Sequence, residues 1–218
     1  MKLSTIFSVA FLGLLAQSAV LPEDAPEVDI VADAQRSVLQ AMGGELGGDE
    51  LSKRNFGISF DLGFSINILS LQNSMRSSHG CPLLNWDQNC YTAAKQVVSK
   101  YDCSSNSQTS GSSSSGNWGT GSSNPFSPII DCGNVVNSWY NKGKKYNYGA
   151  TCPLNAFTNL IWKSTSKVGC AYKDCRSHGN GYYYYCNYSP SVSNPSNSQK
   201  TSNVAPPKSP CTVCATSH

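Results

Sequence analysis

The sequence predicts an α+β domain in which helices precede a pair of antiparallel strands. Three observations carry this prediction. Apolar residues recur at helical spacing from residue 62 onward, two strand-like runs flank a late Gly179-Asn180-Gly181 turn, and all ten cysteines lie after residue 80. Because the helices come first and the late strands pair with each other, we expect helices that cover a sheet, braced by disulfides.

The first two helices follow from apolar spacing. Residues 62–78 repeat apolar side chains at i, i+4, i+7 and i+11, namely Phe64, Ile68, Leu71 and Met75. Residues 87–101 begin at a good N-cap residue, Asp87. The buried face expected for this second helix consists of Cys90, Ala94, Val97 and Tyr101.

The second half of the chain contains shorter elements. Residues 132–142 are expected to be helical, and residues 154–162 to form a short apolar helix or turn. Residues 167–172 and 181–188 are expected to be the strands.

Two segments are poor in such patterns. Residues 104–123 hold ten Ser and four Gly and predict a flexible surface loop that docks only near Asn117-Trp118. Residues 189–218, rich in Ser, Pro and Asn, are expected to be largely disordered.

The amino terminus has the pattern of a secretory signal. Lys2 gives the positive start, residues 6–15 are apolar, and small residues follow at Ala16, Ser18 and Ala19. We therefore assign residues 1–20 to a signal peptide and expect a secreted, extracellular protein. No later run approaches the ~18 apolar residues that a membrane-spanning helix requires, so stable membrane insertion is not expected.

Residues 21–54 have a different composition from the rest. They carry eight acidic residues against Arg36, Lys53 and Arg54, and contain no cysteine and no aromatic residue. The Lys53-Arg54 pair resembles the Kex-type processing sites of fungal secreted proteins. We expect residues 21–54 to be an acidic propeptide, to be set aside in reasoning about the fold.

The chain after residue 54 is basic. It has twelve Lys and Arg against five Asp and no Glu, a formal net charge of +7. This favours anionic partners such as cell-wall polymers, lipid head groups or acidic proteins. Nucleic acid is not expected as a partner, because the longest basic run is Lys144-Lys145.

The even number of cysteines in an exported chain predicts disulfides rather than a metal site. The ten residues are Cys81, Cys90, Cys103, Cys132, Cys152, Cys170, Cys175, Cys186, Cys211 and Cys214. Zinc at Cys211-x-x-Cys214 would need a second ligand pair that the sequence does not offer. Connectivity cannot be derived from the sequence alone.

Several motifs occur in the order found in one known family. Asn73-x-x-Arg76 precedes a Pro82–Asp87 turn, Val135-x-x-x-Trp139-Tyr140 follows, and Leu160-Ile161-Trp162, Val168-Gly169-Cys170-Ala171 and Cys186-Asn187-Tyr188-Ser189-Pro190 complete the set. Together they resemble the CAP superfamily (SCP domain) of cysteine-rich secretory, antigen 5 and pathogenesis-related class-one proteins. The resemblance covers about residues 64–190 and implies a three-layer α-β-α sandwich in a domain of residues 55–190, with a 191–218 tail.

The family's cleft usually carries two His and two Glu that can hold a divalent metal. The positions that match here are Gln72, Gly116, Lys142 and Ala156. None of these side chains is a zinc ligand or a general acid–base group near neutral pH. The remaining histidines His79 and His178 are expected to be solvated surface residues. We therefore expect no cofactor, no metal and no enzymatic activity.

The resemblance also implies particular disulfides. It suggests Cys170–Cys186 between the strands and Cys103–Cys175 from the second helix. Cys152 would then pair locally, with Cys132. For the four cysteines left over, Cys81, Cys90, Cys211 and Cys214, we expect bonds that tie the tail to the start of the domain. Asn187-Tyr188-Ser189 is the single glycosylation sequon after residue 54, and burial in a strand is expected to hinder its use.

Two functions fit these expectations. Family members bind sterols or fatty acids, and a groove for such a ligand is expected from the aromatic residues Trp118, Phe126, Trp139, Tyr140, Tyr146 and Tyr148. Alternatively, the basic surface recognises a host extracellular protein or an anionic surface, as an effector or virulence factor would. A metal-dependent CAP-type hydrolase or a structural cell-wall protein would be further alternatives. The domain is expected to be a monomer.

Overall fold

A five-stranded sheet forms the centre of the domain in the computed structural model, which describes residues 27–41, 58–103, 110–122, 127–149 and 153–208. The strand order is β1-β4-β5-β3-β2. The strands are β1 (Asn85–Trp86), β2 (Ser110–Ser112), β3 (Gly116–Thr120), β4 (Lys167–Asp174) and β5 (Tyr182–Ser189). β1 runs parallel to β4, and the other neighbours are antiparallel.

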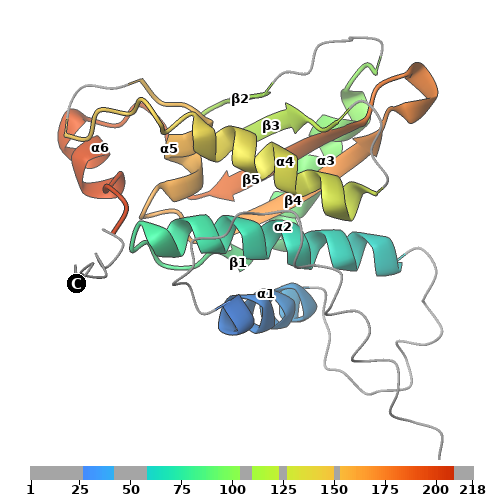
Figure 1. Ribbon diagram of the computed structural model, residues 1–218, viewed down its shortest axis with the longest axis horizontal. Helices are drawn as coiled ribbons and strands as arrows, with labels where there is room; N and C mark the ends of the chain where they lie inside the picture. The colour runs from blue at the N-terminus through green and yellow to red at the C-terminus, as the bar shows by residue number, and fades with distance from the viewer. Residues whose placement is uncertain (1–26, 42–57, 104–109, 123–126, 150–152, 209–218) are drawn as a thin grey trace, which may run out of the picture.

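Helices cover both faces of this sheet (Figure 1). Helices α2 (Ile58–Ser78), α4 (Pro128–Asn141) and α5 (Ala156–Ile161) lie on one face, and α3 (Gln88–Lys100) lies on the other. The larger apolar core fills the space between the sheet and helices α2, α4 and α5. A smaller apolar core lies between the sheet and α3. This arrangement confirms the α+β class and the three-layer α-β-α sandwich.

Helix α3 starts where the sequence predicts. The Asp87 carboxylate accepts a hydrogen bond from Cys90 N at 2.9 Å, and this bond holds the pKa of Asp87 below its ordinary value. Cys90, Ala94 and Val98 are buried, whereas Val97 is 38% exposed. The expected inward position of Val97 was wrong, because the buried face continues at i+8 rather than i+7.

The Ser- and Gly-rich segment contains two strands, so the prediction of a loop was wrong for residues 110–122. β2 and β3 form a hairpin, and β3 pairs with β5, with Asn117 opposite Cys186. The expected docking near Asn117-Trp118 is confirmed. Residues 104–109 lie outside the described part of the chain.

The tail is also more ordered than expected. Residues 190–208 are described and include helix α6 (Asn197–Asn203). Asn203 accepts hydrogen bonds from Lys163 N at 3.1 Å and, through its side chain, from Ser164 N at 2.8 Å. The prediction of a disordered tail was therefore wrong up to residue 208.

Part of the acidic segment belongs to the fold. Residues Glu27–Ala41 form helix α1, and the side chains of Ile30, Ala34 and Val38 on this helix are buried. The signal peptide (1–20) and the Lys53-Arg54 site lie outside the described residues, so both remain predictions.

The two disulfides in the described residues have the pairing that the resemblance implies, Cys103–Cys175 and Cys170–Cys186. Cys81, Cys90 and Cys132 are buried thiols that are not bonded to any described cysteine. Their expected partners Cys152, Cys211 and Cys214 lie outside the described residues.

Arg76 connects four segments from the end of α2. Its side chain is fully buried, and its hydrogen bonds within the described part of the chain all go to main-chain oxygens: to Pro82 at 2.9 Å, Leu160 at 3.0 Å, Trp162 at 2.9 Å and Thr165 at 2.8 Å. Burial lowers the pKa of Arg76. The guanidinium thus fixes α2 against the end of α5 and the turn before β4.

We expect Arg76→Gln to lower the free energy of unfolding by at least about 3 kcal/mol, because several buried carbonyls would lose a charged donor. Urea denaturation measures this loss. Arg176→Gln is the matched control, since Arg176 lies on the surface in an ion pair with Asp174, and it should leave the midpoint nearly unchanged. Equal effects of both substitutions would contradict this role of Arg76.

Candidate functional site

Three of the four expected cleft positions meet in one buried hydrogen-bond network. Gln72, from α2, is fully buried. Its Nε2 lies 3.4 Å from Cys170 Sγ, and its Oε1 accepts a 2.6 Å hydrogen bond from the hydroxyl of Tyr188. Burial raises the pKa of Tyr188, which keeps that hydroxyl protonated as a donor. Both ends of the Gln72 amide are therefore in use.

The network continues through asparagines on β3 and α5. Asn117 Nδ2 donates to Ala156 O at 2.8 Å and to the Tyr188 hydroxyl at 3.3 Å. Asn159 Nδ2 donates to Asn117 Oδ1 at 3.1 Å and to Ser113 O at 2.8 Å. These neutral amides tie the β2–β3 hairpin to the start of α5.

Gly116 leaves no room for a side chain. A Cβ at this position would lie 2.4 Å from Cys186 O and 2.5 Å from the hydroxyl oxygen of Tyr185. Because real Cβ contacts are not that short, a carboxylate could not stand here without moving β5. The packing of the central strand thus excludes the acidic ligand that the family often has.

Lys142 separates from the other three positions. It caps the end of α4, is exposed, and donates from Nζ to Ser110 O at 2.9 Å. A cation at this place, a hydrogen-bonded amide at Gln72 and no ligating side chain at Gly116 or Ala156 do not fit a divalent metal. Among the residues that the structure describes, no group of three or more His, Cys, Asp and Glu is arranged to hold a metal.

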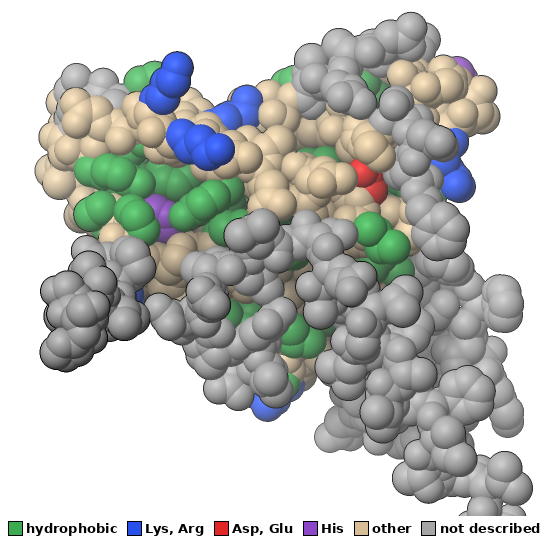
Figure 2. Space-filling model, in the orientation of Figure 1, with side chains coloured by type: hydrophobic (Ala, Val, Ile, Leu, Met, Phe, Trp, Pro, Cys, Tyr) green, Lys and Arg blue, Asp and Glu red, His purple; other side chains and the backbone are tan. Residues whose placement is uncertain are grey.

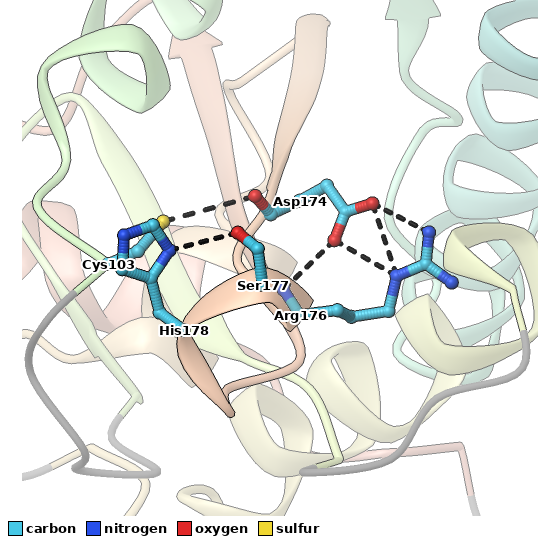
Figure 3. Close-up of polar contacts among 5 residues, drawn as sticks. All are labelled: Cys103, Asp174, Arg176, Ser177 and His178. Carbon is cyan, nitrogen blue, oxygen red and sulfur yellow. Dashed lines mark hydrogen bonds and ion pairs between the residues drawn. The ribbon is translucent and has the colours of Figure 1, made fainter.

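A second polar cluster lies on the turn between β4 and β5 (Figure 3). Ser177 Oγ is 3.1 Å from His178 Nδ1, while the Asp174 carboxylate accepts hydrogen bonds from Arg176, the shortest at 2.6 Å. Ser177 and His178 are exposed neighbours. A hydrolytic triad needs a carboxylate that orients the imidazole, and here the carboxylate binds Arg176 instead.

A polar pocket of about 340 Å³ lies at the start of α3. Its lining includes Asp87, Cys90, Ser115, Lys167 and Asn187. Lys167 Nζ is 3.3 Å from the Asp87 carboxylate. Asn187, the sequon residue, lies half-buried on the central strand, between Gly169 of β4 and Gly116 of β3. This lining suits small polar molecules better than an apolar ligand.

Three half-exposed tyrosines gather elsewhere, around α5. Tyr140, Tyr146 and Tyr148 surround Phe157, with ring centroids 5.8, 5.6 and 6.5 Å from it. We call these three tyrosines the tyrosine patch. Lys144 and Lys145 precede Tyr146 in the chain and are exposed. Figure 2 shows hydrophobic side chains gathered on this face and basic side chains along their border.

His79 lies under the tyrosine patch. It is 4% exposed, so the expectation of a solvated residue was wrong. Nδ1 is 2.7 Å from Ala205 O, and Nε2 is 3.1 Å from the Tyr140 hydroxyl. Because a carbonyl only accepts, Nδ1 carries the proton and Nε2 accepts from Tyr140. The tail folds back onto the end of α2 at this point, where Lys208 N also donates to Ser78 O at 2.7 Å.

The other predicted aromatic residues do not join this patch. Trp139 is fully buried and donates from Nε1 to Trp118 O at 3.0 Å. The Trp118 side chain packs against the core under α3 instead. Phe126 lies outside the described residues. The structure therefore gathers three of the six residues from which a groove was expected.

We expect stability to fall as the pH drops below about 6.5, the pKa of an unfolded histidine. Burial lowers the pKa of His79, so the folded state binds this proton less readily than the unfolded state, and the stabilisation present above pH 6.5 is lost as the pH falls toward the folded pKa. Asp87 and Asp174 have lowered pKa values, so their protonation reduces stability only below about pH 4.

Urea midpoints between pH 7.5 and 5 test this expectation. His79→Gln should flatten the slope in that range, and His178→Gln, at an exposed position, should not. A wild-type midpoint that stays constant between these pH values would contradict it.

We also expect zinc to leave the thermal midpoint of the protein unchanged, because a ligand that binds the native state raises stability with its concentration. A thermal scan with increasing zinc, against the same scan with a chelator, measures this. A rise of the thermal midpoint by several degrees that a chelator reverses would contradict the expectation that the cleft at Gln72, Gly116, Lys142 and Ala156 binds no metal.

Comparison with known proteins agrees with the resemblance seen in the sequence. The model of the cysteine-rich secretory protein family, CAP, matches residues 69–188. Secreted protein RBT4 of Candida albicans is 36% identical over 183 residues, 82% of this chain and 48% of that protein. Secreted protein PRY1 of the same organism is 35% identical over 130 residues, 60% of this chain and 30% of that protein.

Among solved structures, the crystal structure of hookworm platelet inhibitor matches with a TM-score of 0.44 and 20% identity, over 58% of this chain and 69% of that one. The chain spans less than half the length of the two Candida relatives. In the described part of the chain, no helix is long and apolar enough to cross a bilayer. Since the family model covers more than half of its residues, the chain belongs to the CAP family of cysteine-rich secretory proteins.

Proposed function

We propose that this protein is a non-enzymatic extracellular CAP protein that binds a sterol or fatty acid against the tyrosine patch. The observation that carries the proposal is the half-exposed set of Tyr140, Tyr146 and Tyr148 over the buried ring of Phe157. Aromatic rings in this position offer a large apolar surface and, through their hydroxyls, a polar edge for a sterol hydroxyl or a carboxylate.

The chemistry of the cleft positions supports a binding role over catalysis. The side-chain amides of Gln72 and of its neighbour Asn117 form internal hydrogen bonds, and Lys142 donates a hydrogen bond to Ser110 O. General acid–base catalysis needs a positioned group that titrates near the working pH, and these positions offer none.

Export is part of the same proposal. The two Candida relatives are named secreted proteins, and the amino terminus of this chain has the pattern of a signal peptide. An extracellular setting also suits the two disulfides, since such bonds persist outside reducing compartments.

The basic surface favours one second candidate, recognition of an acidic host protein or anionic surface. The chain after residue 54 has a formal charge of +7, and Lys142, Lys144 and Lys145 are exposed next to the tyrosine patch in sequence. Rim charges of this kind raise association rates and are sensitive to salt.

Ligand binding can be tested with radiolabelled cholesterol and palmitate. We expect saturable binding that weakens about tenfold or more in the double variant Tyr146→Ser, Tyr148→Ser, because each lost ring contributes about 1 kcal/mol. Tyr101→Ser is the control, since Tyr101 stacks on Tyr183 under α3, away from the patch.

The outcomes separate the two candidates. No saturable binding of either lipid by the wild-type protein would contradict the proposal. Capture of an acidic partner that is lost in Lys144→Glu, Lys145→Glu and unaffected by the tyrosine substitutions would favour the second candidate instead.

A further inference from the structure

Helix α2 is apolar on two opposite sides, which a helix at the surface of a domain is not. One side carries Phe64, whose ring lies 4.9 Å from Tyr172 and 5.9 Å from Tyr184 of the sheet. The helical spacing of 3.6 residues per turn places Leu62, Ile66 and Leu69 on the opposite side. Leu69 is nevertheless fully buried. Something other than the sheet must therefore cover this second side.

Helix α1 provides the cover. It packs on α2 and β1, on the side of α2 that faces away from α4 (Figure 1). Ile30, Ala34 and Val38, spaced four residues apart, are 3%, 0% and 0% exposed. Solvent-facing positions such as Gln35 and Gln40 lie on the other side of this helix. The acidic segment thus has a core-facing stripe of its own.

The same helix also covers the edge of the sheet. β1 is the edge strand next to β4, and its Trp86 N–H donates to the hydroxyl of Ser37 at 2.7 Å. An edge strand with an open N–H is a site where another chain can pair. Ser37 occupies that donor, so α1 shields a polar edge and an apolar face together.

The contact of α1 with α2 and β1 is small, so the covalent link between α1 and the domain matters for its stability. A 15-residue helix is marginal in water by itself, and among its side chains whose burial is described, those of residues 30–41, three are deeply buried. A stable interface between separate chains usually involves about 20 to 30 residues on each side. A covalent tether supplies an effective concentration of the order of millimolar, which is enough to hold a weak contact.

Opposite net charges also favour the contact between the acidic segment and the domain. Residues 21–54 have a formal charge of −5, and the chain after residue 54 has +7. The dibasic pair Lys53-Arg54 stands between the two parts, so one cut there separates the helix from the domain.

We propose that helix α1 is a tethered mask, which covers the outer side of α2 and the β1 edge in the uncut chain and is released by cleavage after Arg54. The occupant of this face is the chain's own segment 27–41. Cleavage exposes Leu62, Ile66 and Leu69 and frees the Trp86 N–H, so the extracellular form presents a surface that the precursor hides. This inference is independent of lipid binding at the tyrosine patch, which lies around α5.

The test uses the secreted chain with its acidic segment intact and a Kex-type protease that cleaves after Lys-Arg, a pair that occurs in this chain at Lys53-Arg54 and not at the exposed Lys144-Lys145. After cleavage we expect the 27–41 peptide to elute apart from the domain in size exclusion. The dye 1-anilinonaphthalene-8-sulfonate should fluoresce several-fold more brightly. Amide hydrogen exchange should rise in peptides that cover residues 62–69 and 85–87.

Two substitutions in the uncut chain provide a second measurement. Val38→Asp should reproduce the dye and exchange changes without cleavage, because a carboxylate cannot stay at a fully buried apolar position. Gln35→Asp adds the same charge at an exposed position of the same helix and should leave both readouts unchanged.

Three outcomes would overturn the proposal. The helix peptide could remain with the domain in equal amounts after cleavage, or the dye signal and exchange could stay at the level of the precursor. Resistance of the folded chain to cleavage after Arg54 would equally exclude release by this route.

Discussion

The buried guanidinium of Arg76 is the constraint on which the arrangement of this domain depends. A cation without a carboxylate partner is tolerated inside a protein only where oriented dipoles surround it. Here the carbonyls of Leu160 and Trp162, at the end of α5, and of Thr165 take that role. Their positions place α5 against α2, and with it Phe157, the base of the tyrosine patch.

The second constraint is the neutral network around Gln72, Asn117 and Asn159. Gln72 and Asn117 both bond to the Tyr188 hydroxyl inside the core, and Asn159 donates to Asn117, while Asn159 Oδ1 has no partner among the described residues. They hold the β2–β3 hairpin to α5 without any charged group. The cleft of the family usually carries titratable groups at these positions. In this chain the same place holds a neutral hydrogen-bond network with a structural role. This is why we propose recognition at the surface formed by Tyr140, Tyr146 and Tyr148.

Much of the fold could be predicted, and the failures have physical causes. The Asp87 cap and the β4–β5 pair follow from local chemistry, and both were predicted. β2 and β3 were missed because Ser and Gly have little strand preference of their own, and pairing with β5 determines their structure. The burial of His79 depends on Ala205, which is 126 residues away, and no local pattern reports such a contact. Helix α1 was set aside because its composition indicated a propeptide, although composition does not exclude packing.

The amide of Gln72 is occupied by internal contacts, and we propose the tyrosine patch as the place where this protein binds its ligand. Nuclear magnetic resonance of the processed protein, with labelled aromatic rings and side-chain amides, tests both parts in one titration with a sterol. We expect shifts at Tyr140, Tyr146 and Tyr148 and none at the amides of Gln72 and Asn117. Shifts centred on those amides, or on Asn187 in the polar pocket, would contradict it.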